Sequence, residues 1–213
     1  MRLSANAKQI IADINKDDTK MGDIKRLANE IKKDQALALE LWSTEKYIPR
    51  LLSVLVLDKM QLTEERIHQL ATDIQQHERH QADQLADWLL ANQLMKSKKT
   101  INQILTWKTS ELPILQRLFW YYQARLRWVG QKPPENTAEL MISLEKNMAK
   151  AEPEVQWAMN YCAGQIGIHQ VEYRKRCIQL GESIGLYKDE KVSKNCTPAY
   201  LPEFIRIEVA KRE

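Results

Sequence analysis

The sequence has few of the residues that break helices or cross-link a chain. Only 6 of its 213 residues are glycine. Its three cysteines, Cys162, Cys177 and Cys196, are odd in number, widely spaced and without a CxxC pair, which argues against a disulfide framework and a zinc knuckle. No stretch alternates apolar and polar residues for long, so strands are not expected. These absences favour an all-α protein in a reducing compartment.

Long apolar runs are also missing. The first residues, MRLSANAKQIIADINKDD, hold no apolar run of signal-peptide length. No later stretch approaches the ~20 apolar residues that a membrane-spanning helix needs. We therefore expect a cytoplasmic protein with no membrane contact. The balance of 32 Lys and Arg against 28 Asp and Glu, a net charge of +4, permits a nucleic-acid partner without requiring one.

Helical periodicity runs through almost the whole chain. Thr63 and Thr100 are placed to cap helices, and Pro113, Thr137 and Pro153 to open them. The breaker GQKPP, Gly130 to Pro134, is expected to end the helix that starts near Pro113. IPRLLSVLVL is apolar almost all round and is expected to lie in the interior. The other expected core faces are Ile24, Leu27, Ala28 and Ile31; Ile67, Leu70, Ala71 and Ile74; Ala82, Leu85, Ala86 and Leu89; Leu115, Leu118, Phe119, Tyr122 and Leu126; Leu140, Met141, Leu144 and Met148; and Val155, Met159, Cys162 and Ile166.

The helices are expected to form repeats. We count roughly twelve, paired by short polar connections in units close to the ~40-residue period of HEAT-type repeats. The repetition is one of pattern and not of sequence identity, so a globular helical bundle is the alternative to a solenoid. No low-complexity linker divides the chain, and we expect one domain over residues 1–213.

Five stretches, taken in their order along the chain, resemble the DNA alkylation repair family, the AlkD-like alkylpurine DNA glycosylases. The likeness runs from about Met21 to the C-terminal helix and rests on order and spacing, because no single motif is as specific as a metal-binding signature. The stretches are MGDIKRLANEIKKDQALALELW, ADQL, ILQRL, EPEVQWAMNYCAGQIGIH and KNCTPAYLPEFI.

The resemblance implies a fold and an activity. The fold is an all-α, right-handed superhelical solenoid of HEAT-like antiparallel helix pairs, whose basic concave face holds duplex DNA. The activity is release of N3- or N7-alkylated purines by a monomer without cofactor or metal, and without the base flipping that most glycosylases use. Asp83 matches the family aspartate that stabilises the cationic sugar, Arg117 the arginine that holds a backbone phosphate, and Trp157 a tryptophan on the same surface.

Asp83 has a plausible chemistry for that role. It lies beside the apolar stripe of an expected helix, HERHQADQLADWLL. An alkylated purine is already cationic, so its departure needs little protonation, and a poorly solvated carboxylate stabilises the developing oxocarbenium ion. The competing interpretation is a surface carboxylate in an i, i+4 pair with Arg79.

Arg79 marks a departure from the family. It stands one turn before Asp83, where the resemblance predicts a second tryptophan. An aromatic surface is lost there, and the cation can pair with Asp83 and partly neutralise it. Alternatively, Arg79 points at a DNA phosphate and leaves Asp83 available.

The other expected DNA contacts also have structural alternatives. Arg117 can pair with Glu111 or another local acid, and Trp157 can serve the core as well as a contact surface. The run RLFWYYQARLRW carries Arg125 and Arg127, which suit phosphate and cation–π contacts or simply form a basic outer face. KSKK at 96–99 and YRKR at 173–176 are further basic clusters.

A metal site is the weaker interpretation of the histidines. His77 and His80 stand at i, i+3 before Asp83 and Asp87, but a full site needs ligands from another helix. Two function hypotheses therefore remain. The first is an alkylpurine DNA glycosylase, and the second is a non-catalytic solenoid that binds DNA structure or a protein.

Overall fold

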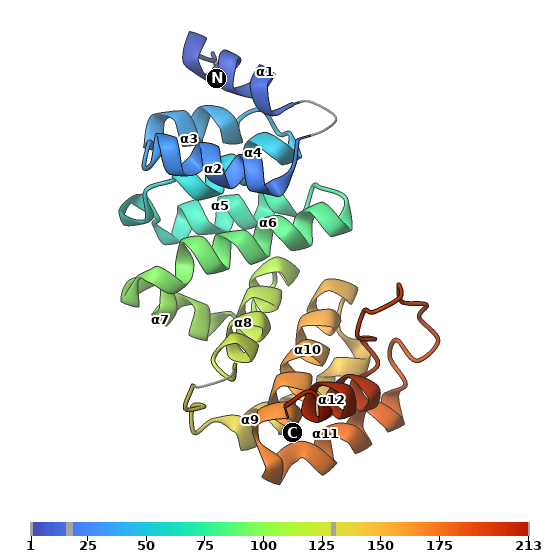
Figure 1. Cartoon of the computed structure of the whole chain (residues 1–213). Helices are drawn as coiled ribbons and strands as arrows, with labels where there is room; N and C mark the ends of the chain where they lie inside the picture. The colour runs from blue at the N-terminus through green and yellow to red at the C-terminus, as the bar shows by residue number, and fades with distance from the viewer. Residues whose placement is uncertain (1, 16–18, 129–130, 213) are drawn as a thin grey trace. The chain divides into compact units, whose positions relative to one another are not determined.

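The computed structural model describes residues 2–15, 19–128 and 131–212, and within them it is all-helical, with no strand (Figure 1). Twelve α-helices and four short 3-10 helices are present in these residues, which confirms the expected fold class of HEAT-like helix pairs. The chain divides into two compact units, residues 1–106 and 107–213. None of the described helices combines the length and the apolar character needed to cross a bilayer.

Unit 1 consists of two layers of helices. Consecutive helices pack as hairpins, α3 on α4 and α5 on α6, while α2 packs on α4 and α4 on α6 in the second layer. The helices α4 and α6 thus each contact a neighbour in their own pair and a neighbour in another pair, as in helical repeats. The elements are α1 Ala5–Ile14, α2 Met21–Ile31, α3 Gln35–Trp42, α4 Tyr47–Val56, η1 Lys59–Gln61, α5 Glu64–Ile74, α6 Arg79–Asn92, η2 Leu94–Lys96 and α7 Lys98–Thr106.

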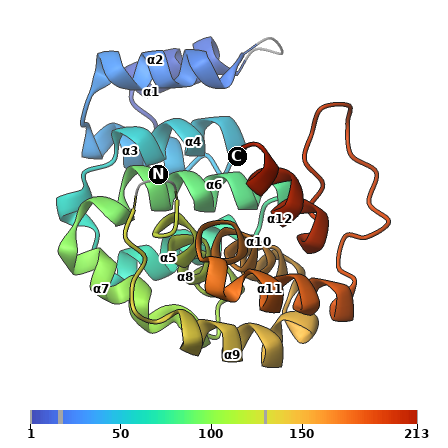
Figure 2. The same ribbon diagram turned by 60° about the horizontal axis from the view of Figure 1, so that its bottom comes forward.

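Unit 2 is built around one long helix, α10, which packs on α8, α9, α11 and α12. Figure 2 shows α11 and α12 beside it. The elements are η3 Trp107–Thr109, α8 Pro113–Arg125, α9 Thr137–Asn147, η4 Met148–Lys150, α10 Pro153–His169, α11 Val171–Ile184 and α12 Leu201–Ala210. Helices cover α10 on several sides. Most of its residues are therefore buried, whereas a helix covered on one side would bury a single stripe.

The expected core faces are nearly all buried, and α4, which contains all of IPRLLSVLVL except its last residue, Leu57, is interior as expected. Leu27, Ile31 and Leu126 differ, because each lies at the margin of its stripe and stays partly exposed. Gly164 allows a close approach in unit 2, since a Cβ atom there would lie 2.5 Å from the ring of Phe204.

Most helix starts agree with the sequence. The Thr63 hydroxyl caps α5, and Pro113 and Pro153 stand in the first turns of α8 and α10. The expected cap at Thr100 is wrong: α7 already begins at Lys98, and the buried Thr100 hydroxyl donates to backbone carbonyls before the helix.

Two boundaries also differ from expectation. The helix of HERHQADQLADWLL begins at Arg79 and not at His77. The helix that starts at Pro113 ends at Arg125, before the GQKPP breaker, and Gly130 of that breaker lies outside the described residues.

Candidate nucleic-acid interface

Asp83 lies on α6 at the margin of a buried face. Ala82, Leu85 and Ala86 are buried on that helix, and Asp83 is half-buried beside them. Arg79 is the first residue of α6 and is exposed. The apolar stripe expected from the sequence is therefore confirmed, and the carboxylate occupies a partly desolvated position, where a negative charge acts more strongly than in water.

A polar network from three other segments holds the start of α6. Arg50, 5 % exposed, donates to the carbonyls of Trp42 and Asp73 at 3.2 and 3.0 Å. Its Nη1 also lies 2.8 Å from Nε2 of His77. The Trp42 indole N–H donates to the Asp73 carboxylate at 2.6 Å, and the Arg50 guanidinium covers the Trp42 ring at 4.8 Å. These bonds join α3, α4 and α5 to the residues just before α6.

His77 is neutral in this network. A guanidinium can only donate, so Nε2 must accept from Arg50, and Nδ1–H is left to donate to the Gln81 side chain at 3.3 Å. Burial, and then the Arg50 cation, lowers the pKa of His77. The ring thus connects Arg50 to the first turn of α6. Among the described residues no group of three or more His, Cys, Asp or Glu side chains could hold a metal ion.

In unit 2, Arg117 and Trp157 come together between α8 and α10. The guanidinium carbon of Arg117 lies 4.6 Å from the centroid of the Trp157 ring, and its Nη1 donates to the Glu154 carbonyl at 3.2 Å. Arg117 is only 1 % exposed. In this arrangement most of its surface packs against protein, so its clearest role is to hold the Trp157 ring.

Trp157 belongs to an aromatic cluster, which we define as Tyr121, Trp157, Tyr161 and Phe204. The Trp157 and Tyr161 rings are stacked, with centroids 5.3 Å apart and planes 9° apart. Tyr121 lies 6.1 and 5.7 Å from these two rings, and Phe204 lies 6.0 Å from Tyr161. Trp157, Tyr161 and Tyr121 are each half-buried, so the cluster contributes to the core and also reaches the surface.

The two remaining arginines of the RLFWYYQARLRW run behave differently. Arg125 is half-buried, and its guanidinium lies 4.2 Å from the Trp128 ring centroid and 5.8 Å from that of Tyr121. It therefore lies at the edge of the aromatic cluster.

Arg127 is a buried structural residue. It is 1 % exposed, and its guanidinium donates to neutral acceptors on Gln123, Asn136, Thr137 and Gln170. Burial lowers its pKa. In this position it presents no guanidinium edge to a DNA backbone, unlike the contact expected from the sequence.

The second basic cluster, YRKR, is also engaged within the protein. Arg174 donates to the carbonyls of Gly167 and Ile168 at 2.9 and 3.1 Å. Arg176 makes two bonds to Glu145, at 2.6 and 2.7 Å, which lower the pKa of that carboxyl group. These arginines join α11 to α10 and α9.

Sequence reasoning missed Tyr121 and Phe204 as members of the aromatic cluster. A signal for Tyr121 was present, because Arg117, Tyr121 and Arg125 are spaced four residues apart and so share one face of α8. No comparable signal existed for Phe204, which meets Tyr161 only through the packing of α12 on α10.

Known proteins resemble this chain in fold and in sequence family. A solved structure of a protein from a family related to the HEAT-like repeat DNA glycosylases, with affinity for branched DNA structures, superposes with a TM-score of 0.69. It is 17 % identical, and the likeness covers 98 % of this chain and 89 % of that one, which shows a common fold. No curated protein matches the chain. The family model described as DNA alkylation repair enzyme matches residues 18–182. The chain therefore belongs to the DNA alkylation repair enzyme family.

Proposed function

We propose that the protein binds duplex DNA and hydrolyses the N-glycosidic bond of N3- or N7-alkylated purines. The observation that carries this proposal is the half-buried Asp83 carboxylate at the margin of the buried face of α6. A carboxylate held there by a rigid helix stabilises a cation that develops beside it, and needs no reorganisation to do so.

The reaction follows from the charge of the lesion. The alkylated purine is cationic before cleavage, so it leaves as a neutral base when the C1′–N bond breaks. Positive charge moves to the sugar, where Asp83 stabilises it electrostatically. Water then adds its oxygen to C1′ and releases one proton to solvent. No metal ion or cofactor enters this scheme.

The aromatic cluster and Arg125 support DNA contact. The Arg117 guanidinium and the stacked Tyr161 ring both lie against the Trp157 indole, so these two side chains already occupy part of its face. Arg125, half-buried beside Trp128, is the arginine of this region best placed for a phosphate.

The test is release of 3-methyladenine and 7-methylguanine from methylated duplex DNA. Wild type should release base, and Asp83→Asn should reduce release at least a hundredfold while duplex affinity changes less than threefold, as order-of-magnitude expectations for loss of one electrostatic stabiliser. The matched control is Asp87→Asn, one turn further along the same helix. Equal release by wild type and Asp83→Asn would refute the assignment.

A second candidate is a non-catalytic protein that binds DNA structure. Two observations favour it: Arg79 stands where the resemblance predicts a tryptophan, and the similar solved structure is described by its affinity for branched DNA. If Arg79 suppresses catalysis, Arg79→Trp should raise base release. This candidate would be favoured if neither wild type nor Arg79→Trp released base and if wild type bound a four-way junction more tightly than a duplex.

A further inference from the structure

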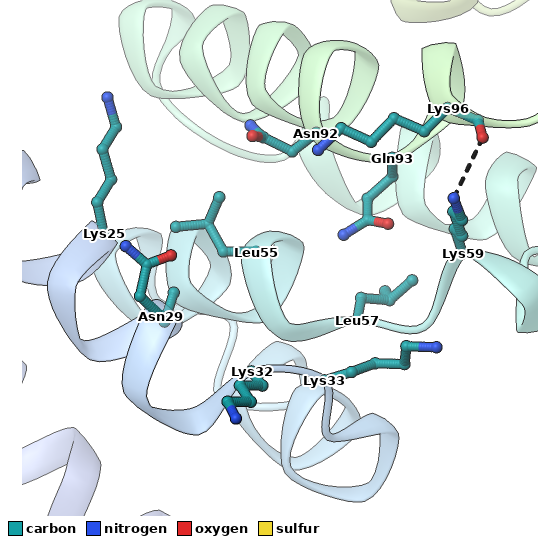
Figure 3. Close-up of a pocket in the computed structure, with 11 residues that line it drawn as sticks. Lys25, Asn29, Lys32, Lys33, Leu55, Leu57, Lys59, Asn92, Gln93 and Lys96 are labelled. Atoms are coloured by element: carbon teal, nitrogen blue, oxygen red, sulfur yellow. Dashed lines mark hydrogen bonds between the residues drawn. The ribbon is translucent and has the colours of Figure 1, made fainter.

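A lysine-rich pocket lies in unit 1, and neither Asp83 nor Arg79 is among the residues that line it. Its volume is about 650 Å³. Three parts of the chain supply its lysines: α2 with the residues that follow it, η1, and η2 (Figure 3). These lysines are Lys25, Lys32, Lys33, Lys59 and Lys96.

The charge of this pocket is one-sided. None of the eleven residues that line it, all in the described part of unit 1, is acidic. Five of the lining residues are lysines, although the net charge of the whole chain is only +4. Like charges brought together repel each other, and an anion removes that cost. The pocket therefore has the electrostatics of an anion site.

Interactions within the protein neutralise only part of this charge. Lys33 pairs with Asp58 at 3.3 Å, Lys59 donates to the Lys96 carbonyl at 3.3 Å, and Lys25 lies over the Trp88 ring. For Lys32 and Lys96 the described residues provide no ion pair. In Figure 3 the Lys96 side chain runs back toward Asn92, whereas the Lys25 and Lys32 ammonium groups turn outward at the rim.

Lys32 also occupies a strained backbone conformation. It ends α2 with φ 65° and ψ −127°, a region in which glycine is strongly preferred. A lysine at this position therefore costs stability relative to glycine. Its side chain is therefore a candidate for a task that glycine could not perform.

We propose that this pocket binds phosphate groups, and that they belong to the DNA backbone. The second half rests on the DNA binding proposed above. Asp83 and Asn92, which lines the pocket, are nine residues apart on α6, a rise of about 13.5 Å along the helix axis at 1.5 Å per residue. At 3.4 Å per step this corresponds to about four base pairs. Lysine ammonium groups attract phosphate as point charges and do not read base sequence.

The first experiment compares two double variants of equal charge. Lys32→Gln with Lys96→Gln removes two pocket charges, and Lys8→Gln with Lys46→Gln removes two exposed charges elsewhere in unit 1. Each lost phosphate contact lowers the slope of log affinity against log salt by about 0.9. Between 50 and 200 mM salt, wild type should therefore lose about tenfold more affinity than the pocket variant. The control variant should retain the wild-type slope, and equal changes in both variants would overturn the proposal.

A second measurement separates DNA from free phosphate compounds. Calorimetric titration with sodium tripolyphosphate should show binding to wild type and to the control variant, and at least tenfold weaker binding to the pocket variant. Such binding, with a DNA salt slope that the pocket variant leaves unchanged, would keep the phosphate site and overturn its assignment to DNA. If no variant binds DNA, the proposed function fails and this titration alone decides the pocket. Absence of any pocket-specific effect in both assays overturns the inference.

Lys32→Gly provides an independent check. Glycine relieves the backbone strain, so the variant should be at least as stable as wild type toward urea. It should nevertheless bind DNA with a salt slope lower by about 0.9. Higher stability with an unchanged slope would mean that Lys32 has no part in phosphate binding.

Discussion

Replacing Arg127 by alanine should destabilise the fold and leave DNA contacts largely unaffected. The guanidinium donates to Gln170 Oε1 at 3.2 Å, to the Gln123 carbonyl at 2.9 Å, to Asn136 Oδ1 at 2.7 Å and to Thr137 Oγ1 at 3.0 Å. These acceptors come from α8, α9 and the residues that precede α9 and α11. The side chain thus connects three helices of unit 2.

The size of the effect follows from what the substitution leaves behind. Three of the four acceptors belong to buried residues, Gln123, Thr137 and Gln170, and an unsatisfied buried polar group costs about 1–3 kcal/mol. The bonds that remain, from Thr137 to Gln170 and from Asn136 to Gln123, reduce the loss, and such costs do not add fully. We expect a decrease of about 3 kcal/mol in the free energy of unfolding, within the ~5–15 kcal/mol of a typical protein.

The group that interacts electrostatically with Arg127 is the Cys162 thiol. Burial raises the pKa of the nearby Cys162 thiol to about 12, so the thiol is neutral at ordinary pH. Removing Arg127 therefore leaves no uncompensated anion on that residue.

Urea denaturation of Arg127→Ala and Arg125→Ala makes the comparison. Arg125 is half-buried and covers the Trp128 ring, so its loss should cost about 1 kcal/mol or less and reduce DNA affinity. Equal stability losses, or a stable Arg127→Ala protein that no longer binds DNA, would refute the structural role of Arg127.

Two further predictions concern packing and pH. Gly164→Ala places a Cβ atom 2.5 Å from Phe204, so the free energy of unfolding should fall by about 1–3 kcal/mol. The control is Gly22→Ala, which should not lower that free energy because no atom lies within 4 Å of the new Cβ. Equal urea midpoints for the two variants would contradict this prediction. The pKa of His77 is lower in the folded chain than its ordinary value of 6.5. As the pH falls, the unfolded chain therefore binds the proton before the folded chain does. The stability contributed by neutral His77 is thus lost as the pH falls below about 6.5. His77→Gln should weaken this dependence in urea melts at pH 7.5 and 5.5, and an unchanged dependence would exclude His77 as its source.

Much of the fold follows from local patterns in the sequence. The spacing of Ala82, Leu85 and Ala86 predicts the buried face of α6, and that spacing also places Asp83 at its margin. The caps and prolines fix the starts of α5, α8 and α10 for equally local reasons. These features depend on residues within a few turns of each other, so a single sequence contains the information.

Whether an individual charged side chain is buried or exposed depends on partners far away in the sequence. Arg125 and Arg127 look alike in the sequence, but Arg127 is buried because its acceptors stand as far away as Gln170. The lysine pocket likewise combines positions from 25 to 96, and KSKK by itself predicts only a basic turn. Packing between elements decides these cases, and no periodicity encodes it.

The tryptophans point to a carboxylate, and not an aromatic surface, as the main stabiliser of the cation in the proposed reaction. In the described residues four of the six tryptophans already carry one of the protein's own cations over the ring, at 4.2–5.3 Å from the centroid. Arg117 occupies Trp157 in this way, and Arg79 stands where the resemblance predicts another tryptophan. Trp157→Phe should therefore keep base release within about threefold of wild type, since a cation–π contact is worth only ~0.5–1 kcal/mol at exposed sites. Single-turnover release beside Asp83→Asn measures the difference, and a loss in Trp157→Phe as large as that in Asp83→Asn would show that the indole ring holds the cation.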